Sequence, residues 1–320
     1  MGLDPPRTGF RSPARDEGAA ISFQSRMHRV FLGPNGIRAG WRILYAICMW
    51  VFFSSLLTIL LLAIPAIRLW VSTQNLRVMT PSLLLFLEGT SAVAAILSAL
   101  VIALIEKRSF ADYGLPLRGA LGKRLGQGLL LGFAMVSALI GLIAAMNGFS
   151  PGQPVLAGGD AVRFGLLYML GFLLLGFYEE FSFRGYLQAT LTSGIGFWPA
   201  AVLLAIAFGG GHFLNAGERG IGLLTAGCFG LLAAFSLRRT GDIWLAIGMH
   251  ASWDWGQTYL YSVPDSGILA KGHLLNSSFH GPNWLTGGSV GPECSLFVFA
   301  VLALAALVIH YMFPAKQEVR

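Results

Sequence analysis

The chain has 320 residues, of which 55% are hydrophobic and only 12% are charged, and its mean hydropathy is +0.67. This composition excludes a soluble domain built around a single core and indicates an integral membrane protein. The net charge of +7 and the pI near 9.6 are explained by membrane topology and by contact with anionic lipid headgroups. No nucleic-acid partner is expected.

Apolar runs long enough to cross a bilayer follow one another along the chain. A helix needs about 20 apolar residues to span a hydrocarbon core of roughly 30 Å. Runs of this kind occupy residues 43–67, 82–105, 125–147, 161–190, 197–214, 220–237, 243–262 and 295–313. They predict an all-α fold, namely a polytopic membrane bundle of about eight transmembrane helices.

The segments outside these runs are more polar. Residues 1–41 predict a flexible cytosolic N-terminal tail, and residues 315–320 predict a short cytosolic C-terminal tail. Between them lies one membrane helical domain, residues 42–314, in which residues 264–293 form a long outer loop rich in Gly, Ser, Asn and Pro.

The Lys and Arg residues indicate the orientation. With eight spans both termini lie on one side of the membrane, and that side would hold 16 of the 22 Lys and Arg residues. The opposite side would hold five, and Arg184 lies inside a span. Because cytoplasmic segments carry the excess of positive charge, we predict cytoplasmic termini and a multi-pass protein of a bacterial cytoplasmic membrane.

Ionisable residues inside the spans are few and clustered. A charge at the bilayer centre costs roughly 2.5 to 3.5 kcal/mol on insertion scales, so each such residue needs a partner or a function. Away from the ends of the spans, all of them except Glu88 fall in the three segments FYEEFSFR (177–184), FGGGH (208–212) and HASWD (250–254). Glu88 belongs to no motif, and we expect it to be paired or to snorkel near a helix end.

Helix geometry separates the two adjacent acids. Glu180 and Arg184 are four residues apart and can pair on one helix face, whereas Glu179 lies roughly 100° away. We therefore expect Glu179 to be the free carboxylate that faces a neighbouring helix. The purely structural alternative is a buried ion pair that locks helix packing.

The depths of these residues predict a common cavity. Counted at 1.5 Å per residue from the predicted turns, Glu179 and His212 lie roughly 20 Å and 24 Å along their helices. His250 and Asp254 lie one turn apart on a further helix, roughly 12 Å and 18 Å along it. With ordinary helix tilt, all four side chains can converge on one inward-facing cavity.

Such a cavity suits hydrolysis of a peptide bond. A glutamate beside a histidine can take a proton from water, and a second histidine can donate to the oxyanion that forms on the amide. Asp254, when ionised, can only accept hydrogen bonds, so it is expected to orient His250. Neither Ser182 nor Ser252 has the spacing that would indicate a nucleophile with its base.

Three alternatives stay open at this stage. Glu179, His212 and His250 could hold a divalent metal such as zinc, although they come from three helices and no His-Glu-x-x-His sequence is present. Buried acids and histidines also form the proton relays of proton-coupled membrane transporters. A non-catalytic membrane scaffold or immunity protein could have the same fold.

Taken together, the motifs resemble a known family. The three motifs are Glu179-Glu180-x-x-x-Arg184, Phe208-x-x-x-His212 and His250-x-x-x-Asp254. In this order on successive spans they are similar to the signatures of the CPBP family, the CAAX-protease and bacteriocin-processing intramembrane endopeptidases, which are related to the Ras-converting prenyl-protein protease. The resemblance covers the core helices, residues 161–262, which would form the catalytic core.

The resemblance implies an intramembrane endopeptidase that cleaves a membrane-associated protein or peptide near its C-terminus or at a leader. By motif position, Glu179 would be the general base and His212 its partner on the water, while His250 and Asp254 would stabilise the oxyanion. Glu180 and Arg184 would support the site. The family has been described both as metalloproteases and as metal-free glutamate proteases. Asp254 stands where the prenyl-protein proteases have Asn, so it fits the orientation of His250 better than donation to the oxyanion.

Overall fold

The computed structural model describes residues 30–33, 36–75, 78–215 and 218–314. Residues 1–29 of the expected N-terminal tail and the expected C-terminal tail lie outside the described residues. The α-helices are α2 (Ala39–Leu62), α3 (Pro65–Ser72), α4 (Pro81–Glu106), α5 (Lys123–Ala145), α6 (Gly158–Glu180), α7 (Gln188–Ile195), α8 (Phe197–Gly211), α9 (Ile221–Thr240), α10 (Trp244–Trp255), α11 (Asn283–Thr286) and α12 (Phe297–Met312).

Shorter elements join or extend these helices. The 3₁₀-helices are η1 (Phe110–Tyr113), η3 (His212–Leu214) and η5 (Pro292–Cys294), and the π-helices are η2 (Phe181–Leu187) and η4 (Gly256–Leu260). Two antiparallel pairs of two-residue strands complete the described structure. They are β1 (Leu32–Gly33) with β2 (Gly36–Ile37), and β3 (Phe149–Ser150) with β4 (Ser278–Phe279).

The predicted all-α, polytopic membrane fold is confirmed. In the described part of the chain, six helical stretches are long and apolar enough to cross a membrane. The other two predicted spans are shorter helices: α10 has 12 residues and continues into η4, and α12 has 16. At 1.5 Å per residue, α12 is roughly 24 Å long, slightly less than a bilayer core. The first predicted span ends early, because Pro65 starts the separate helix α3.

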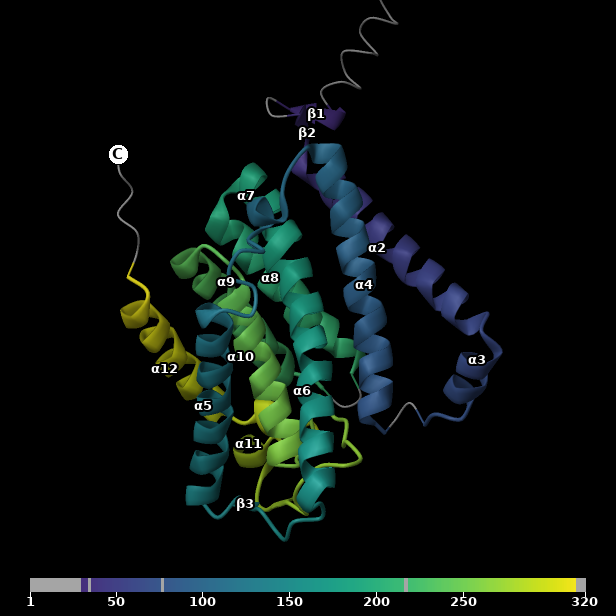
Figure 1. Cartoon of the computed structure of the whole chain (residues 1–320). Helices are drawn as coiled ribbons and strands as arrows, with labels where there is room; N and C mark the ends of the chain where they lie inside the picture. The colour runs from purple at the N-terminus through teal and green to yellow at the C-terminus, as the bar shows by residue number, and fades with distance from the viewer. Residues whose placement is uncertain (1–29, 34–35, 76–77, 216–217, 315–320) are drawn as a thin grey trace, which may run out of the picture.

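Helix α10 is the centre of the bundle. Every residue from Trp244 to Asp254 is buried, and the helix packs against α5, α6 and α9 (Figure 1). The contact with α5 is close because a Cβ atom on Gly128 or Gly132 would overlap the backbone of α10. Helix α9 also packs on α10, and the Phe208 ring of FGGGH lies 6.2 Å from the ring of His250. His250 and Asp254 therefore project from a helix that is held from several directions.

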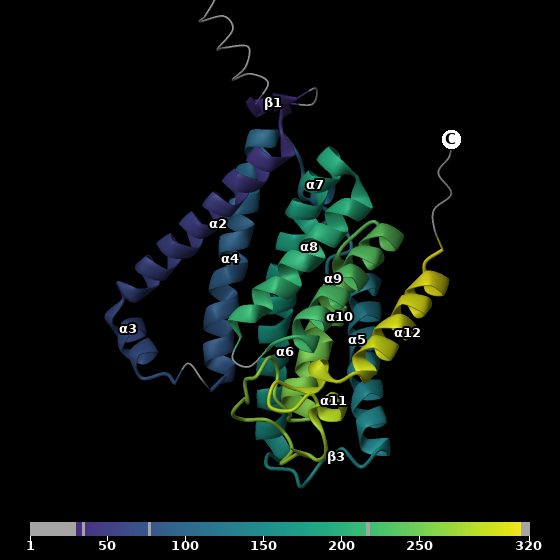
Figure 2. The ribbon, with the colours of Figure 1, turned by 180° about the vertical axis from the view of Figure 1, so that it is seen from behind.

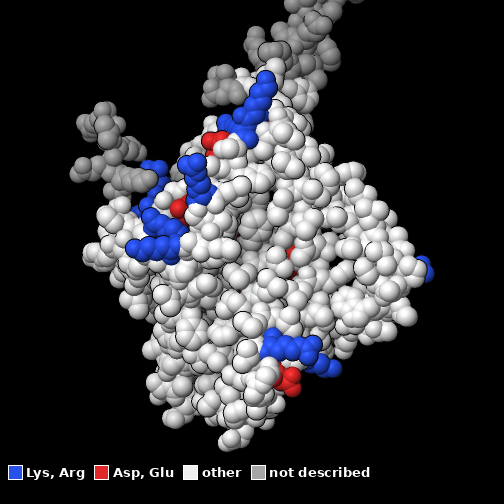
Figure 3. All heavy atoms as spheres, in the orientation of Figure 1, with Lys and Arg blue, Asp and Glu red and all other residues white. Residues whose placement is uncertain are grey.

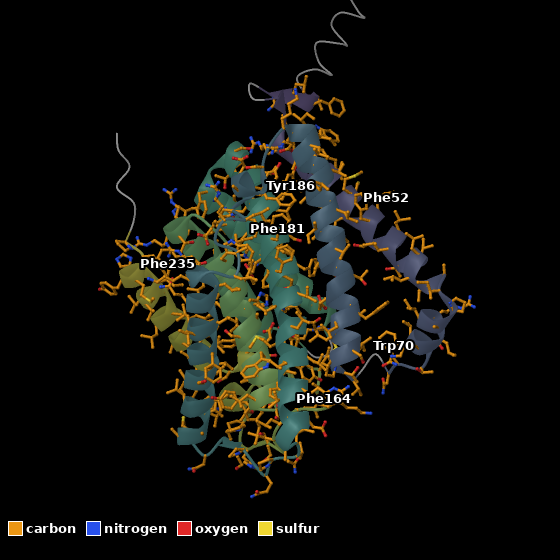
Figure 4. The ribbon with its side chains drawn as sticks, in the orientation of Figure 1. Phe52, Trp70, Phe164, Phe181, Tyr186 and Phe235 are labelled. Atoms are coloured by element: carbon orange, nitrogen blue, oxygen red, sulfur yellow. The ribbon has the colours of Figure 1, made fainter. Side chains whose placement is uncertain are left out.

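Helices α2 and α3 stand apart from this central group. Figures 1 and 2 show them on the far side of α4, away from α9 and α12. The side chain of Phe52 on α2 is largely exposed, as expected for a surface that faces lipid, and Figure 4 shows it at the edge of the molecule. A mainly apolar cavity of about 440 Å³ lies between α2, α4, η2 and α8. Phe181 and Tyr186 from η2 point into this region (Figure 4).

A polar cluster fastens α2 to the rest of the bundle. The Glu106 carboxylate, at the end of α4, accepts hydrogen bonds from Arg42 at 2.5 and 2.7 Å, from Tyr113 at 3.0 Å and from Tyr186 at 2.9 Å. Tyr45 also donates to it. These donors come from α2, η1 and η2, so one carboxylate links four segments at the end of the bundle where α2 begins.

The charges on the surface agree with a membrane protein. Helix α2 begins and α12 ends at the same end of the bundle (Figure 1). Figure 3 shows most of the visible Lys and Arg side chains gathered at this end, a second group near the other end, and a mostly uncharged band between them. The placement of this end in the cytoplasm remains a prediction from the Lys and Arg distribution.

Candidate functional site

His250 lies at the centre of a group of carboxylates. Its ring Nδ1 atom is 2.9 Å from Glu180 Oε1. Its Nε2 atom faces two further carboxylates, Asp254 Oδ2 at 3.5 Å and Glu179 Oε2 at 3.7 Å. The first distance is that of a hydrogen bond, whereas the other two exceed the usual limit. The imidazole is thus fixed at Nδ1 and held loosely at Nε2.

The ion pair expected within the first motif is present. Arg184 Nη1 lies 3.3 Å from Glu180 Oε1, and the two side chains are 2% and 0% exposed. The guanidinium also lies over the ring of Phe208, 4.3 Å from its centroid. Because Arg184 compensates the charge of Glu180, this carboxylate can stay ionised in the interior and accept a hydrogen bond from His250.

Glu179 differs from its neighbour in exposure. Its side chain is 25% exposed, while that of Glu180 is fully buried. The offset of roughly 100° between consecutive helical residues lets the two acids approach different nitrogen atoms of His250. Glu179 is therefore the acid that solvent or a ligand can reach.

His212 approaches the same region from the end of α8. Its Nδ1 atom is 2.8 Å from the carbonyl oxygen of Phe208. Because a carbonyl oxygen can only accept, Nδ1 carries a proton, and in the neutral ring Nε2 is left as an acceptor. The Phe208 ring lies between the two histidines, with centroid distances of 4.9 Å to His212 and 6.2 Å to His250.

The motif residues line a common cavity in part. His212, His250 and Asp254 line a cavity of about 70 Å³ between α8, α9, α10 and α12. Glu179 is outside this lining, although its Oε2 atom lies 3.7 Å from His250 Nε2. The cavity could hold a few water molecules, so it is a small chamber next to His250.

Three acids that the sequence analysis did not single out line the same cavity: Glu218, Asp265 and Glu293. Glu218 accepts a hydrogen bond from Asn215 at 2.8 Å, and Asp265 accepts one from Thr258 at 2.9 Å. They escaped notice because they lie in loops, where an acid is unremarkable. The only available signal was the length of the outer loop, since long loops often fold back over a site.

Burial changes the titration of the loop acids. It raises the pKa of Asp265 to about 6, although Thr258 and nearby histidines act in the opposite direction. Burial also raises the pKa of Glu293 well above its usual range, and the neighbouring Asp265 charge adds to this. Glu293 accepts hydrogen bonds from Ser266 N at 2.7 Å and from Gln257 Nε2 at 2.5 Å.

Both acid-bearing helices change their winding at the site. The π-helix η2 begins at Phe181, directly after Glu179 and Glu180. The π-helix η4 begins at Gly256, two residues after Asp254. Short π-helical turns are rare and occur frequently at functional sites. Their presence here agrees with the other indications of a functional region.

Glu88 does not lie where the sequence analysis expected it. It is the eighth residue of α4, well inside the helix rather than near its end, and its side chain is partly exposed. Within the described residues, it makes no hydrogen bond and no ion pair. Its charge interacts with those of Glu179 and His250. No partner among the described residues therefore accounts for this acid.

The proposed metal ligands do not fit a metal ion. Across the described ranges, no group of three or more His, Cys, Asp and Glu side chains is arranged to hold one. The Nδ1 atoms of His212 and His250 are taken up by the Phe208 carbonyl oxygen and by Glu180, so that only their Nε2 atoms could bind an ion. Cys48, Cys228 and Cys294 are free and lie far apart in sequence. No step of the chemistry below is derived through a metal.

Fold and site together define the class: a multi-pass membrane protein with carboxylates and imidazoles gathered between its helices. Residues 161–256 match the family described as Type II CAAX prenyl endopeptidase Rce1-like. This stretch contains all three motifs, so the family resemblance that they indicated is confirmed for these helices. A comparison with curated proteins gives no match.

Proposed function

We propose that the protein hydrolyses a peptide bond of a membrane-associated protein or peptide, with Glu179 as the general base for a water molecule. The observation that carries this proposal is that the two ring nitrogen atoms of His250 have different surroundings. Glu180 fixes its Nδ1 atom at 2.9 Å, while Nε2 lies 3.5 Å or more from Asp254 and Glu179. A proton on Nε2 is therefore available to a new acceptor in the site.

The reaction starts at Glu179. Its carboxylate takes a proton from the water while the water oxygen attacks the carbonyl carbon of the substrate. His212 supports this step because its Nε2 atom, as an acceptor, can hold the second proton of the water in a hydrogen bond. The carbonyl oxygen becomes an oxyanion, toward which His250 Nε2–H turns.

Collapse of this intermediate completes hydrolysis. The carbon–nitrogen bond breaks, and Glu179 returns its proton to the leaving amine nitrogen, so that the carboxylate is regenerated. Asp254, one turn beyond His250, orients the ring and compensates its positive charge. Glu180 and Arg184 fix the opposite nitrogen. Asp254 and Glu180 thus hold the same imidazole from different sides, and Arg184 holds Glu180, which prepares the donor before the substrate binds.

The apolar cavity beside the site supports a membrane-associated substrate. Tyr178 and Ser182, which flank Glu179 and Glu180 in sequence, line this cavity of about 440 Å³. Its walls would accommodate an apolar segment or chain of a substrate that enters from the lipid, while the peptide bond to be cleaved reaches Glu179.

The test compares purified variants in lipid nanodiscs. Wild-type protein is incubated with a library of membrane-anchored peptides, with and without a lipid chain, and products are identified by mass spectrometry. Glu179→Gln and His212→Ala are expected to lower cleavage by at least about a hundredfold while thermal unfolding remains close to that of the wild type. Asp160→Asn, an exposed acid in the first turn of α6, is the matched control and should keep full activity.

The alternatives give different results. Full cleavage by both variants would refute the proposal. Proton-driven uptake into vesicles without cleavage would indicate a transporter instead. A scaffold would retain its binding partner in both variants and cleave none of the peptides.

A further inference from the structure

Glu88 is an acid within the membrane for which the proposed reaction has no use. Helix α4 starts at Pro81, so Glu88 lies seven residues, or roughly 10 Å, inside the helix. A charged carboxylate at such a depth costs on the order of 2.5 kcal/mol or more unless a partner compensates it. Within the part of the chain that the structure describes, every other acid at the site has a hydrogen-bond or ion-pair partner, and Glu88 has none.

The helix face of Glu88 looks toward the site. Leu84, one turn earlier, packs on Gly171 of α6, where an added Cβ atom would overlap its side chain. Ala95, two turns later on the same face, lines the apolar cavity. Glu88 therefore lies on the same face of α4 as Leu84, which contacts α6, and Ala95, which lines the cavity.

Glu179 lies on α6, the helix that packs against this face of α4. It lies eight residues beyond Gly171, about two turns further along α6, and helical side chains lean toward the N-terminus of their helix. The Glu88 charge interacts with Glu179 and His250, and both carboxylates also influence Tyr178. Glu88 is therefore close enough to Glu179 to act on a substrate that is bound there.

The charges around the site are unbalanced. Glu88, Glu179, Glu180 and Asp254 surround the path to His250, and Arg184 is the only Lys or Arg side chain among the described residues that pairs with one of them. The chamber beside His250 adds three more carboxyl groups and no Lys or Arg to its described lining. Figure 3 shows a few red acidic atoms in a gap near the middle of the mostly uncharged band of the molecule. Apolar walls strengthen the resulting negative potential, which favours cations.

We propose that Glu88 is a specificity residue that binds a cationic side chain, Lys or Arg, located close to the scissile bond of the substrate. This inference rests on the proposed peptidase function. The missing partner of Glu88 would then be supplied by the substrate, which compensates the cost of the buried acid only in the complex. The same negative potential would disfavour an acidic side chain or a free terminal carboxylate at this position.

A charge-exchange experiment tests the proposal. Membrane-anchored peptides that wild-type protein cleaves are made with Lys, Gln or Glu at each position within four residues of the cleaved bond. For one position we expect kcat/KM to be about tenfold or more higher with Lys than with Gln, and lowest with Glu. In Glu88→Gln the Lys preference should fall below about twofold, and in Glu88→Lys it should reverse in favour of Glu. Asp160→Asn should keep the wild-type preference.

Binding measurements separate this inference from the proposed function. The Glu179→Gln variant should bind the Lys peptide about tenfold more tightly than the Gln peptide, even though it does not cleave it, and Glu88→Gln in that background should remove the difference. A Lys preference that persists in Glu88→Gln, or an equal loss for all three peptides, would overturn the role of Glu88. Cleavage by Glu179→Gln would instead refute the peptidase mechanism and leave the binding preference as the test of Glu88.

Discussion

Removal of Arg184 gives a quantitative test of the electrostatics in the core of the site. The substitution Arg184→Met keeps an unbranched apolar side chain but takes away the cation that compensates Glu180. Both side chains are essentially inaccessible, with 2% and 0% exposure, and their atoms are 3.3 Å apart. Breaking a buried pair from one side typically costs 3 to 5 kcal/mol, because the remaining charge stays buried.

The structure places the expected cost at the lower end of this range. His250 Nδ1 also donates to Glu180 at 2.9 Å, so the carboxylate retains one charge-assisted partner when Arg184 is lost. We therefore expect Arg184→Met to lower the free energy of unfolding by about 3 kcal/mol. The measurement is reversible unfolding in mixed micelles, in which a denaturing detergent is added stepwise and helix content is followed by circular dichroism.

A second substitution identifies the cause of the loss. In the double variant Glu180→Gln with Arg184→Met, neither residue of the pair carries a charge, and the Gln oxygen can still accept the hydrogen bond from His250. The double variant should recover most of the stability that Arg184→Met loses. If Arg184→Met is as stable as the wild type, or if the double variant is less stable than Arg184→Met, the pair does not compensate charge in the way described.

Three further predictions concern other parts of the bundle. Gly132→Ala should lower the free energy of unfolding by about 1 to 3 kcal/mol, because the added methyl group meets the backbone of Met249 where α5 and α10 touch; Gly126→Ala, where nothing is close, serves as the control in thermal unfolding. Glu106→Gln should destabilise the protein, because it removes the charge that Arg42 compensates at 2.5 Å. Limited proteolysis of the α2 region would detect the loosened contact with α4, and unchanged proteolysis would contradict this prediction. The pKa of Asp265 is raised to about 6 in the folded protein. Above about pH 4, Asp265 therefore keeps a proton in the folded protein that it has lost in the unfolded chain. The free energy of unfolding should consequently fall as pH rises from about 4 to 6 and then level off. Asp265→Asn should flatten this part of the stability profile, and an unaltered profile would refute the assignment.

The membrane architecture was accessible from the sequence because it depends on chain length and hydropathy. Long apolar runs must become helices in lipid, where backbone groups have no other hydrogen-bond partners. The pairing of Glu180 with Arg184 was equally predictable, since it depends only on a spacing of four residues. Helix α3 shows the limit of such reasoning, because hydropathy alone joined it to α2 although Pro65 separates them.

The site itself was only partly predictable. The motif residues were recognised because a charge in an apolar run is conspicuous, but their contacts depend on how separate helices pack. Hydropathy could not show that Glu180, rather than Glu179, makes the hydrogen bond to His250 Nδ1. Nor could it show that Glu218, Asp265 and Glu293 from the loops line a cavity beside the same ring. Glu88 was noticed, but it was expected near a helix end, whereas it is the eighth residue of α4.

The division of labour between the two adjacent glutamates follows from their surroundings. The two residues have identical side chains and approach the same imidazole, yet Glu180 is sealed against Arg184 and Glu179 is 25% exposed. A carboxylate that is paired from two sides is a poor proton acceptor, because protonation would break both interactions. The exposed carboxylate has no such hindrance and can exchange protons with water. A swap of their roles would require the helix to rotate by roughly 100°, which the Arg184 pair and the closely packed α10 both oppose. The proposed base and the proposed support are therefore fixed by packing, and of these two glutamates it is Glu179 with which the Glu88 charge on α4 interacts.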